Sequence, residues 1–148
     1  MRNGKILALL SSFWILTNCV HSEGQDTTIK LAEKTFYEGL FQSLPSPYKL
    51  QENAEQLVIY KFYSPWCQSC MEELINLQFF VKQNDKDCKV YLFTIEESDT
   101  AKARQGFKVH YIDGLFERTK EQQVPLTFVF KNKSFAKKYS GPVDYSAL

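Results

Sequence analysis

The stretch VIYKFYSPWCQSCMEEL, residues 58–74, holds the features that decide the fold. It belongs to an apolar run, LVIYKFY at 57–63, whose β-branched and aromatic residues are typical of a buried central strand. Cys67 and Cys70 follow, and from them an amphipathic pattern reaches about Val81. The sequence therefore predicts a central strand, a short connection and a helix that begins at Cys67.

A metal site is one chemistry to weigh for two cysteines at this spacing. Tetrahedral zinc needs four ligands, normally as two such pairs or as one pair with spaced histidines. The remaining candidates are Cys88, His110 and His21, and they show no partner spacing. We therefore do not favour a zinc site, and we interpret His110 as an ordinary loop residue.

A purely structural disulfide is the second possibility, and reactive thiols are the third. A Cys67–Cys70 bridge would close a loop too short to stabilise the fold much. At the start of a helix, however, backbone N–H groups and the helix dipole favour the thiolate, which is the nucleophile. The second sulfur, one turn later, can attack a mixed disulfide and release the product. The spacing therefore favours thiol–disulfide exchange.

The rest of the chain predicts a mixed α/β sheet. Further strands are expected at 88–95, at 126–130 and, as the second arm of a hairpin, at 135–141. Helices are expected from Thr27 or Thr28 to about Leu44, over 96–107 and over 115–122, whereas the last residues, 143–148, can form one turn at most. The expected fold is a central mixed sheet flanked by helices, with an extra N-terminal helix and a shortened C-terminal helix.

Length and composition indicate one globular domain. The chain has 148 residues, of which 44% are hydrophobic, and a formal net charge of +1 without a basic stripe. Nucleic-acid binding therefore has no electrostatic support. We place the domain at 23–148, with its core at about 48–143.

The first 22 residues have the layout of an export signal. Two basic residues precede an apolar run at 6–16, and no acidic residue occurs before Glu23. The run is too short to span a bilayer, which needs about 20 residues. Two processing routes stay open: cleavage after residue 22, or a lipoprotein-type signal that ends at residue 18 and leaves Cys19 as a lipid anchor. Both predict a periplasmic location, free or membrane-attached.

Export also bears on the cysteine count. The chain has four cysteines, and Cys19 is either removed or lipidated. The odd number that remains does not suit a scaffold held by disulfides. We interpret Cys67 and Cys70 as a redox pair and Cys88 as a buried bystander.

The segments VIYKFYSPWCQSC and VPLTFVF together resemble the thioredoxin superfamily, which combines WCxxC with a proline just before a later strand. The intervening sequence is similar to the exported redoxin or TlpA-type branch, and the resemblance covers roughly residues 50–143. It implies a thioredoxin fold and no cofactor beyond the dithiol itself.

The resemblance also implies roles for single residues. Cys67 would be the attacking thiolate, Cys70 the resolving thiol, and Trp66 a shield on one side of the pair. Val124–Pro125 would be a cis peptide bond packed against the disulfide, and the Val124 backbone would pair with an extended substrate strand.

Lys61 departs from the thioredoxin pattern. Thioredoxin has a buried acid six residues before its first cysteine, and this chain has Lys61 there. A lysine on a central strand has to lower its pKa, reach around the sheet edge to water, or find a partner. In either protonation state it would influence the thiol titration.

Other charged or neutral positions near the motif carry weaker signals. Gln68 and Ser69 are uncharged and argue against an extreme oxidant. Glu72 and Glu73 are interpreted as a solvated face near the start of a helix, where their charge suits the dipole. The helix at 28–44, or a partner, is expected to cover the sheet face that the shortened C-terminal helix leaves.

The resulting hypothesis is an exported thiol–disulfide oxidoreductase that acts on protein substrates, as a reductase fed by a membrane-borne electron donor. One alternative is a disulfide oxidase or isomerase that assists secretion or conjugation machinery. The other is a peptide-binding module that uses the Val124–Pro125 ledge and keeps the disulfide as structure.

Overall fold

The computed structural model describes residues 23–50, 56–84 and 87–148. The predicted signal at 1–22, with Cys19 and His21, lies outside the described residues. The helices are α1 (Glu23–Gln42), α2 (Gln68–Gln83) and α3 (Leu115–Arg118), with the 3₁₀ turns η1 (Glu97–Asp99) and η2 (Tyr145–Ala147). The strands are β1 (Leu57–Tyr63), β2 (Cys88–Thr94), β3 (Val109–His110), β4 (Leu126–Lys131) and β5 (Ser134–Ser140).

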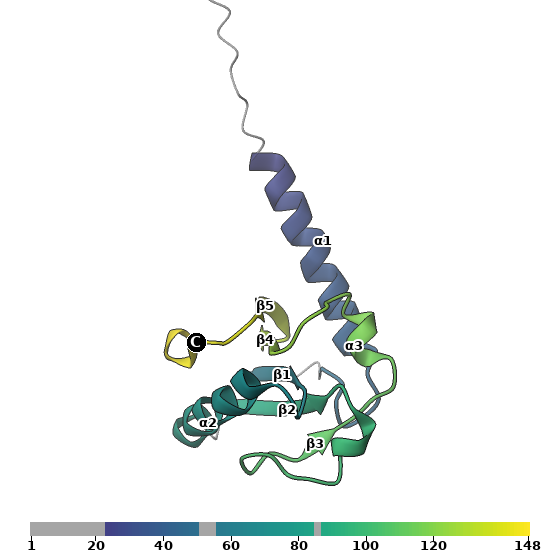
Figure 1. Cartoon of the computed structure of the whole chain (residues 1–148). Coiled ribbons are helices and arrows are strands. Elements are labelled where there is room, and N and C mark those ends of the chain that lie inside the picture. Colours follow the sequence, from purple (N-terminus) through teal and green to yellow (C-terminus); the bar gives the residue numbers. More distant parts are fainter. Residues whose placement is uncertain (1–22, 51–55, 85–86) are drawn as a thin grey trace, which may run out of the picture.

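One mixed sheet holds these strands in the order β3-β2-β1-β4-β5. The pairs β1–β2 and β2–β3 are parallel, whereas β1–β4 and β4–β5 are antiparallel. Figure 1 shows the sheet with α2 and α1 as its main helices. The predicted mixed sheet with an antiparallel edge and a hairpin at its end is confirmed.

The central strand β1 supplies side chains to both faces of the sheet, because successive residues of a strand point to opposite sides. Val58, Tyr60 and Phe62 belong to the core cluster on the α1 face. Ile59 and Tyr63 belong to the cluster on the α2 face, which also holds Cys67 and Cys70. Lys61 has the parity of this second set, so it points toward α2.

The helix α1 packs an aromatic face onto the sheet. Phe41 is fully buried, and its ring centroid lies 4.2 Å from that of Tyr60 and 5.0 Å from that of Phe128. Figure 1 shows the last turns of α1 beside the sheet and its first turns extending past it. Because α1 contributes to the core, the packed unit is wider than the expected 48–143.

The C-terminal residues cover part of the other face. Val143, Tyr145 and Leu148 pack into the cluster that contains α2. The expectation that the N-terminal helix covers the face left by the shortened C-terminal helix is therefore wrong: α1 lies on the opposite face, and the last residues themselves pack beside α2.

The helix expected over 96–107 does not form beyond the turn η1. The buried carboxylate of Asp99 binds the hydroxyl of Tyr63 and the guanidinium of Arg104, which competes with a continuous helix. Gln105 and Gly106 then adopt positive φ of 48° and 81°, and Arg104 pairs with Phe107 in a tight turn. The loop is thus folded back against the end of β1.

Replacing Phe41 with alanine tests whether α1 is part of the cooperative unit. Phe41→Ala should lower the free energy of unfolding by about 3–5 kcal/mol, because a large buried ring leaves a cavity. Leu31→Ala is the matched control on the same helix, since Leu31 is 63% exposed. Urea unfolding followed by circular dichroism measures both. Equal small losses would contradict a structural role for α1.

Candidate active site

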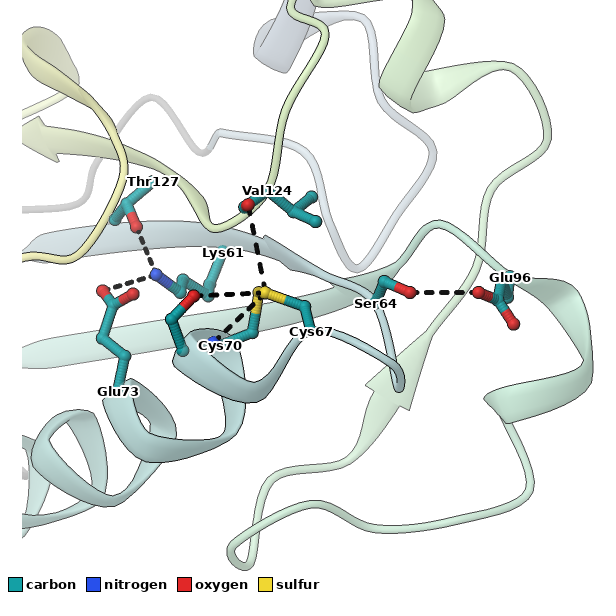
Figure 2. Close-up of a disulfide and its surroundings, with 9 residues drawn as sticks. Lys61, Ser64, Cys67, Cys70, Glu73, Glu96, Val124 and Thr127 are labelled. Carbon is teal, nitrogen blue, oxygen red and sulfur yellow. Dashed lines mark hydrogen bonds and ion pairs between the residues drawn. A yellow bond between two sulfur atoms is a disulfide. The ribbon is translucent and has the colours of Figure 1, made fainter.

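Cys67 and Cys70 form a disulfide at the amino end of α2 (Figure 2), and their Cα atoms are 5.2 Å apart. The helix begins at Gln68 rather than at Cys67, because Cys67 has extended backbone and is the N-cap. Its sulfur accepts a hydrogen bond from the backbone N–H of Cys70 at 3.2 Å. The helix start therefore presents a donor to this sulfur, as the thiolate hypothesis requires.

The two sulfurs differ in their surroundings. Cys67 is 8% exposed and Cys70 is fully buried. The Ser69 hydroxyl lies 3.5 Å from the Cys67 sulfur, and the Val124 carbonyl oxygen lies 3.9 Å from it. The structure thus gives Cys67 the outer position and Cys70 the inner one.

The Val124–Pro125 peptide bond is cis, as the resemblance implies. Figure 2 shows Val124 across from the cysteines, with its carbonyl directed at Cys67. Pro125 is buried, and the strand β4 begins just after it. The structure therefore brings the predicted ledge and the predicted redox pair together.

Trp66 is 70% exposed directly before Cys67. It presents a large apolar surface to solvent beside the outer sulfur. Its predicted role as a shield of the pair, or as a contact for substrate, stays a prediction.

Lys61 is fully buried on the α2 side of β1. Its ammonium lies 2.5 Å from Glu73 Oε1 and donates a hydrogen bond to Thr127 Oγ1 at 2.8 Å. Figure 2 shows the three side chains meeting beside the disulfide. The prediction that Lys61 reaches around the sheet edge to water is wrong, because β1 is the middle strand. The prediction that it finds a partner is confirmed, and the partner is Glu73.

Burial lowers the pKa of the Lys61 ammonium to about 8, and the carboxylate of Glu73, which raises it, offsets this only in part. A desolvated ammonium is costly unless it is paired and hydrogen-bonded. The pair with Glu73 is therefore the condition for a charged lysine at this position.

Glu73 is only 3% exposed, so its interpretation as part of a solvated face is wrong, although Glu72 is exposed. Its Oε1 receives Lys61, the Tyr145 hydroxyl at 2.9 Å and the Val143 backbone N–H at 3.1 Å. Glu73 Oε2 is buried and has no hydrogen-bond partner among the described residues. One carboxylate oxygen thus gathers donors from β1 and from the C-terminal segment.

The connection before the cysteines is fastened to the loop after β2. Ser64 donates to Glu96 Oε1 at 3.0 Å, and Tyr63 donates to Asp99. Although burial raises the pKa of Asp99, hydrogen bonds from Arg104 and Tyr63 bring it below its usual range. These contacts hold the end of β1 in place ahead of the cysteines.

The remaining candidate residues lie outside this cluster. His110 is half-buried, with Nδ1 2.9 Å from the Tyr48 hydroxyl, and packs against aromatic rings. Burial raises the pKa of the Cys88 thiol to about 11. Among residues 23–50, 56–84 and 87–148, no group of histidine, cysteine and acidic side chains is arranged to hold a metal ion.

Sequence reasoning missed three members of the cluster: Glu73, Thr127 and Tyr145. Glu73 stands three residues after Cys70, so it shares a helix face with a cysteine that had to be inside, and this spacing was a usable signal. Thr127 and Tyr145 depend on strand register and on the path of the C-terminus, for which the sequence holds no comparable signal.

No family model and no curated protein sequence matches the chain. Solved structures do match it. The exposed lipoprotein thioredoxin Etrx1 of Streptococcus pneumoniae aligns with a TM-score of 0.56 at 17% identity, over 68% of this chain and 85% of that one. This chain has the thioredoxin fold.

Two further structures agree with this assignment of a thioredoxin fold. StoA of Bacillus subtilis aligns with a TM-score of 0.50 at 21% identity, over 64% of this chain and 81% of its own. A secreted disulfide oxidoreductase of Mycobacterium tuberculosis, homologous to E. coli DsbE, gives 0.52 at 14% identity, over 64% and 78%. The predicted fold is therefore confirmed. Within the part of the chain that the structure describes, no helix has the length and apolarity needed to cross a membrane.

The buried ion pair between Lys61 and Glu73 leads to a stability prediction. Lys61→Met should lower the free energy of unfolding by about 3 kcal/mol or more, because it leaves a buried carboxylate without its cation. The double variant Lys61→Met/Glu73→Leu should recover most of that loss, since both charges are then gone. Urea unfolding at neutral pH compares the variants. A double variant less stable than either single one would contradict the account.

The same pair should set the thiol titration of the reduced protein. Lys61→Met leaves the carboxylate of Glu73 unpaired and should raise the pH midpoint of cysteine alkylation by about one unit. Glu73→Gln removes the carboxylate that keeps Lys61 charged, so Lys61 loses its proton more readily and the midpoint should shift less than in Lys61→Met. Iodoacetamide alkylation from pH 5 to 10, followed by mass spectrometry, gives the midpoints. An unchanged midpoint in Lys61→Met, or a larger shift in Glu73→Gln than in Lys61→Met, would exclude this electrostatic control.

Proposed function

We propose that this chain is an exported thiol–disulfide oxidoreductase that reduces disulfides of protein substrates through Cys67 and Cys70. The observation that carries the proposal is the arrangement of the pair. Cys67 is the outer sulfur at a helix N-cap with a backbone donor, and Cys70 is buried one turn later. This is the geometry that disulfide exchange needs, and the thioredoxin fold supports it.

The reaction takes place in two exchange steps. The Cys67 thiolate attacks one sulfur of a substrate disulfide, forms a mixed disulfide and releases the first substrate thiolate. The Cys70 thiolate then attacks the Cys67 sulfur, which forms the Cys67–Cys70 disulfide and releases the second substrate thiolate. Two electrons pass to the substrate, and the two protons from the cysteine thiols end on the substrate thiols.

The local charge favours a reductase. A strong oxidant owes its potential to a strongly stabilised thiolate in its reduced form. Here the outer sulfur has one backbone donor, a hydroxyl neighbour and uncharged Gln68 and Ser69 in the motif. Lys61 and Glu73, a buried pair of opposite charges beside the disulfide (Figure 2), neutralise each other.

Substrates are proposed to bind across Trp66 and the Val124–Pro125 ledge. Trp66 offers exposed apolar surface, and Val124 lies outside the sheet ladder, opposite Cys67. An extended segment of a substrate protein that pairs with the Val124 backbone would bring its disulfide to Cys67.

Export and a membrane-borne electron donor complete the proposal. The N-terminal signal pattern supports a periplasmic location, and on the lipoprotein-type route Cys19 is the lipid anchor. Two proteins of the same fold are described as an exposed lipoprotein and as secreted. A reductase outside the cytoplasm has to be recharged after each cycle, so a dithiol carrier in the membrane is the expected donor.

Insulin reduction by dithiothreitol tests the enzymatic proposal. The wild-type protein should accelerate it several-fold, Cys67→Ser should abolish the acceleration, and Cys70→Ser should accumulate a mixed disulfide visible on a non-reducing gel. Cys88→Ser is the matched control and should retain the rate. If wild type and Cys67→Ser give the same rate of insulin reduction, the result contradicts the enzymatic proposal and favours the peptide-binding alternative.

A further inference from the structure

The C-terminal segment reaches Glu73, beside the redox pair, through the Tyr145 side chain and the Val143 backbone. After β5 the chain passes to the α2 face, where Val143 and Tyr145 are buried. The turn η2 packs against α2, on that helix's face of the sheet. The Tyr145 hydroxyl and the Val143 N–H both donate to Glu73 Oε1. Among the described residues, the C-terminal segment thus supplies two of the donors to that oxygen, and Lys61 supplies another.

The same oxygen holds the ammonium of Lys61, so the contacts form a continuous series. Tyr145 binds Glu73, Glu73 binds Lys61, and Lys61 binds Thr127 on β4. Every member is buried, so water does not screen these interactions. Glu73 stands one turn after Cys70 on the same helix.

We propose that Tyr145 is a positioning residue of the redox site: its hydroxyl holds the Glu73 carboxylate on Lys61 and thereby fixes the charge beneath Cys70. This inference rests on the proposed function for its biological meaning, although the electrostatic effect itself is measurable on the isolated protein.

Tyr145 is suited to the role as a permanent donor. Burial, and then the negative charge of Glu73, raise the pKa of Tyr145 well above its usual value, so the hydroxyl keeps its proton. Its ring packs against Phe80 with centroids 5.7 Å apart. Tyr145→Phe therefore removes the donor and leaves the packing surface.

The titratable groups that face this cluster can be named element by element. They are Lys61 from β1, Glu73 from α2, Tyr145 from η2 and Cys88 from β2, whose charge would act on Tyr145. On the other side of the cysteines, Glu96 binds Ser64, and Asp99 binds Tyr63 and Arg104. Because burial raises the pKa of Cys88 to about 11, its thiol is neutral at neutral pH.

A double-mutant cycle on the reduced protein tests the proposal. The four proteins are wild type, Tyr145→Phe, Glu73→Gln and the double variant, and the readout is the pH midpoint of cysteine alkylation. Tyr145→Phe should raise the midpoint by about 0.3–0.5 unit. The hydroxyl that donates to Glu73 is then missing, so the negative charge of the carboxylate acts more strongly on the thiols. In the Glu73→Gln background it should give no measurable shift, since the carboxylate charge is gone.

Tyr139→Phe is the matched control, since it removes a tyrosine hydroxyl on the neighbouring strand β5 that no contact links to Glu73 among the described residues. If Tyr145→Phe does not fold, the midpoint of cysteine alkylation is measured on a chain truncated after Asp144, which also lacks the Tyr145 hydroxyl and should shift in the same direction. An equal shift in both backgrounds, or none in wild type, would overturn the proposal. Alkylation needs no protein substrate, so a failure here is separate from a failure of insulin reduction.

Discussion

Lys61 is a charged side chain on the middle strand of the sheet, and the arrangement around the cysteines follows from the need to neutralise it. With β2 on one side and β4 on the other, the strand offers no path to water. The ammonium therefore requires a carboxylate within the α2 face, and Glu73 supplies it at 2.5 Å. This pair ties the helix that carries both cysteines to the middle strand of the sheet.

That constraint has consequences for function. An unpaired charge beside a redox pair would shift the pKa of the thiols, whereas two opposite charges that neutralise each other shift it little. The same carboxylate also recruits the end of the chain through Val143 and Tyr145. The segment at 143–145 thus contacts the site, and the aromatic core on the α1 face stabilises the sheet from the other side.

Much of this was available from the sequence. The apolar run of β1, the CxxC at a helix start and the proline before β4 each follow a local rule, and the structure places them together as expected. The predictions that were wrong concern residues whose surroundings depend on tertiary packing. The sequence predicts a solvated Glu73 because an acid early in a helix is usually exposed, and the helical pattern at 96–107 gives no sign that Asp99 is buried. Tyr145 joins the site only because the chain crosses to α2, which no local pattern encodes.

The reduction potential of the Cys67–Cys70 couple, titrated against glutathione, tests the central claim most directly. A neutralised pair beneath a modestly stabilised thiolate predicts a potential at the reducing end of the range, more negative than about −240 mV. A value near −120 mV, the range of a strong oxidant, would contradict both the charge balance beneath the cysteines and the reductase assignment.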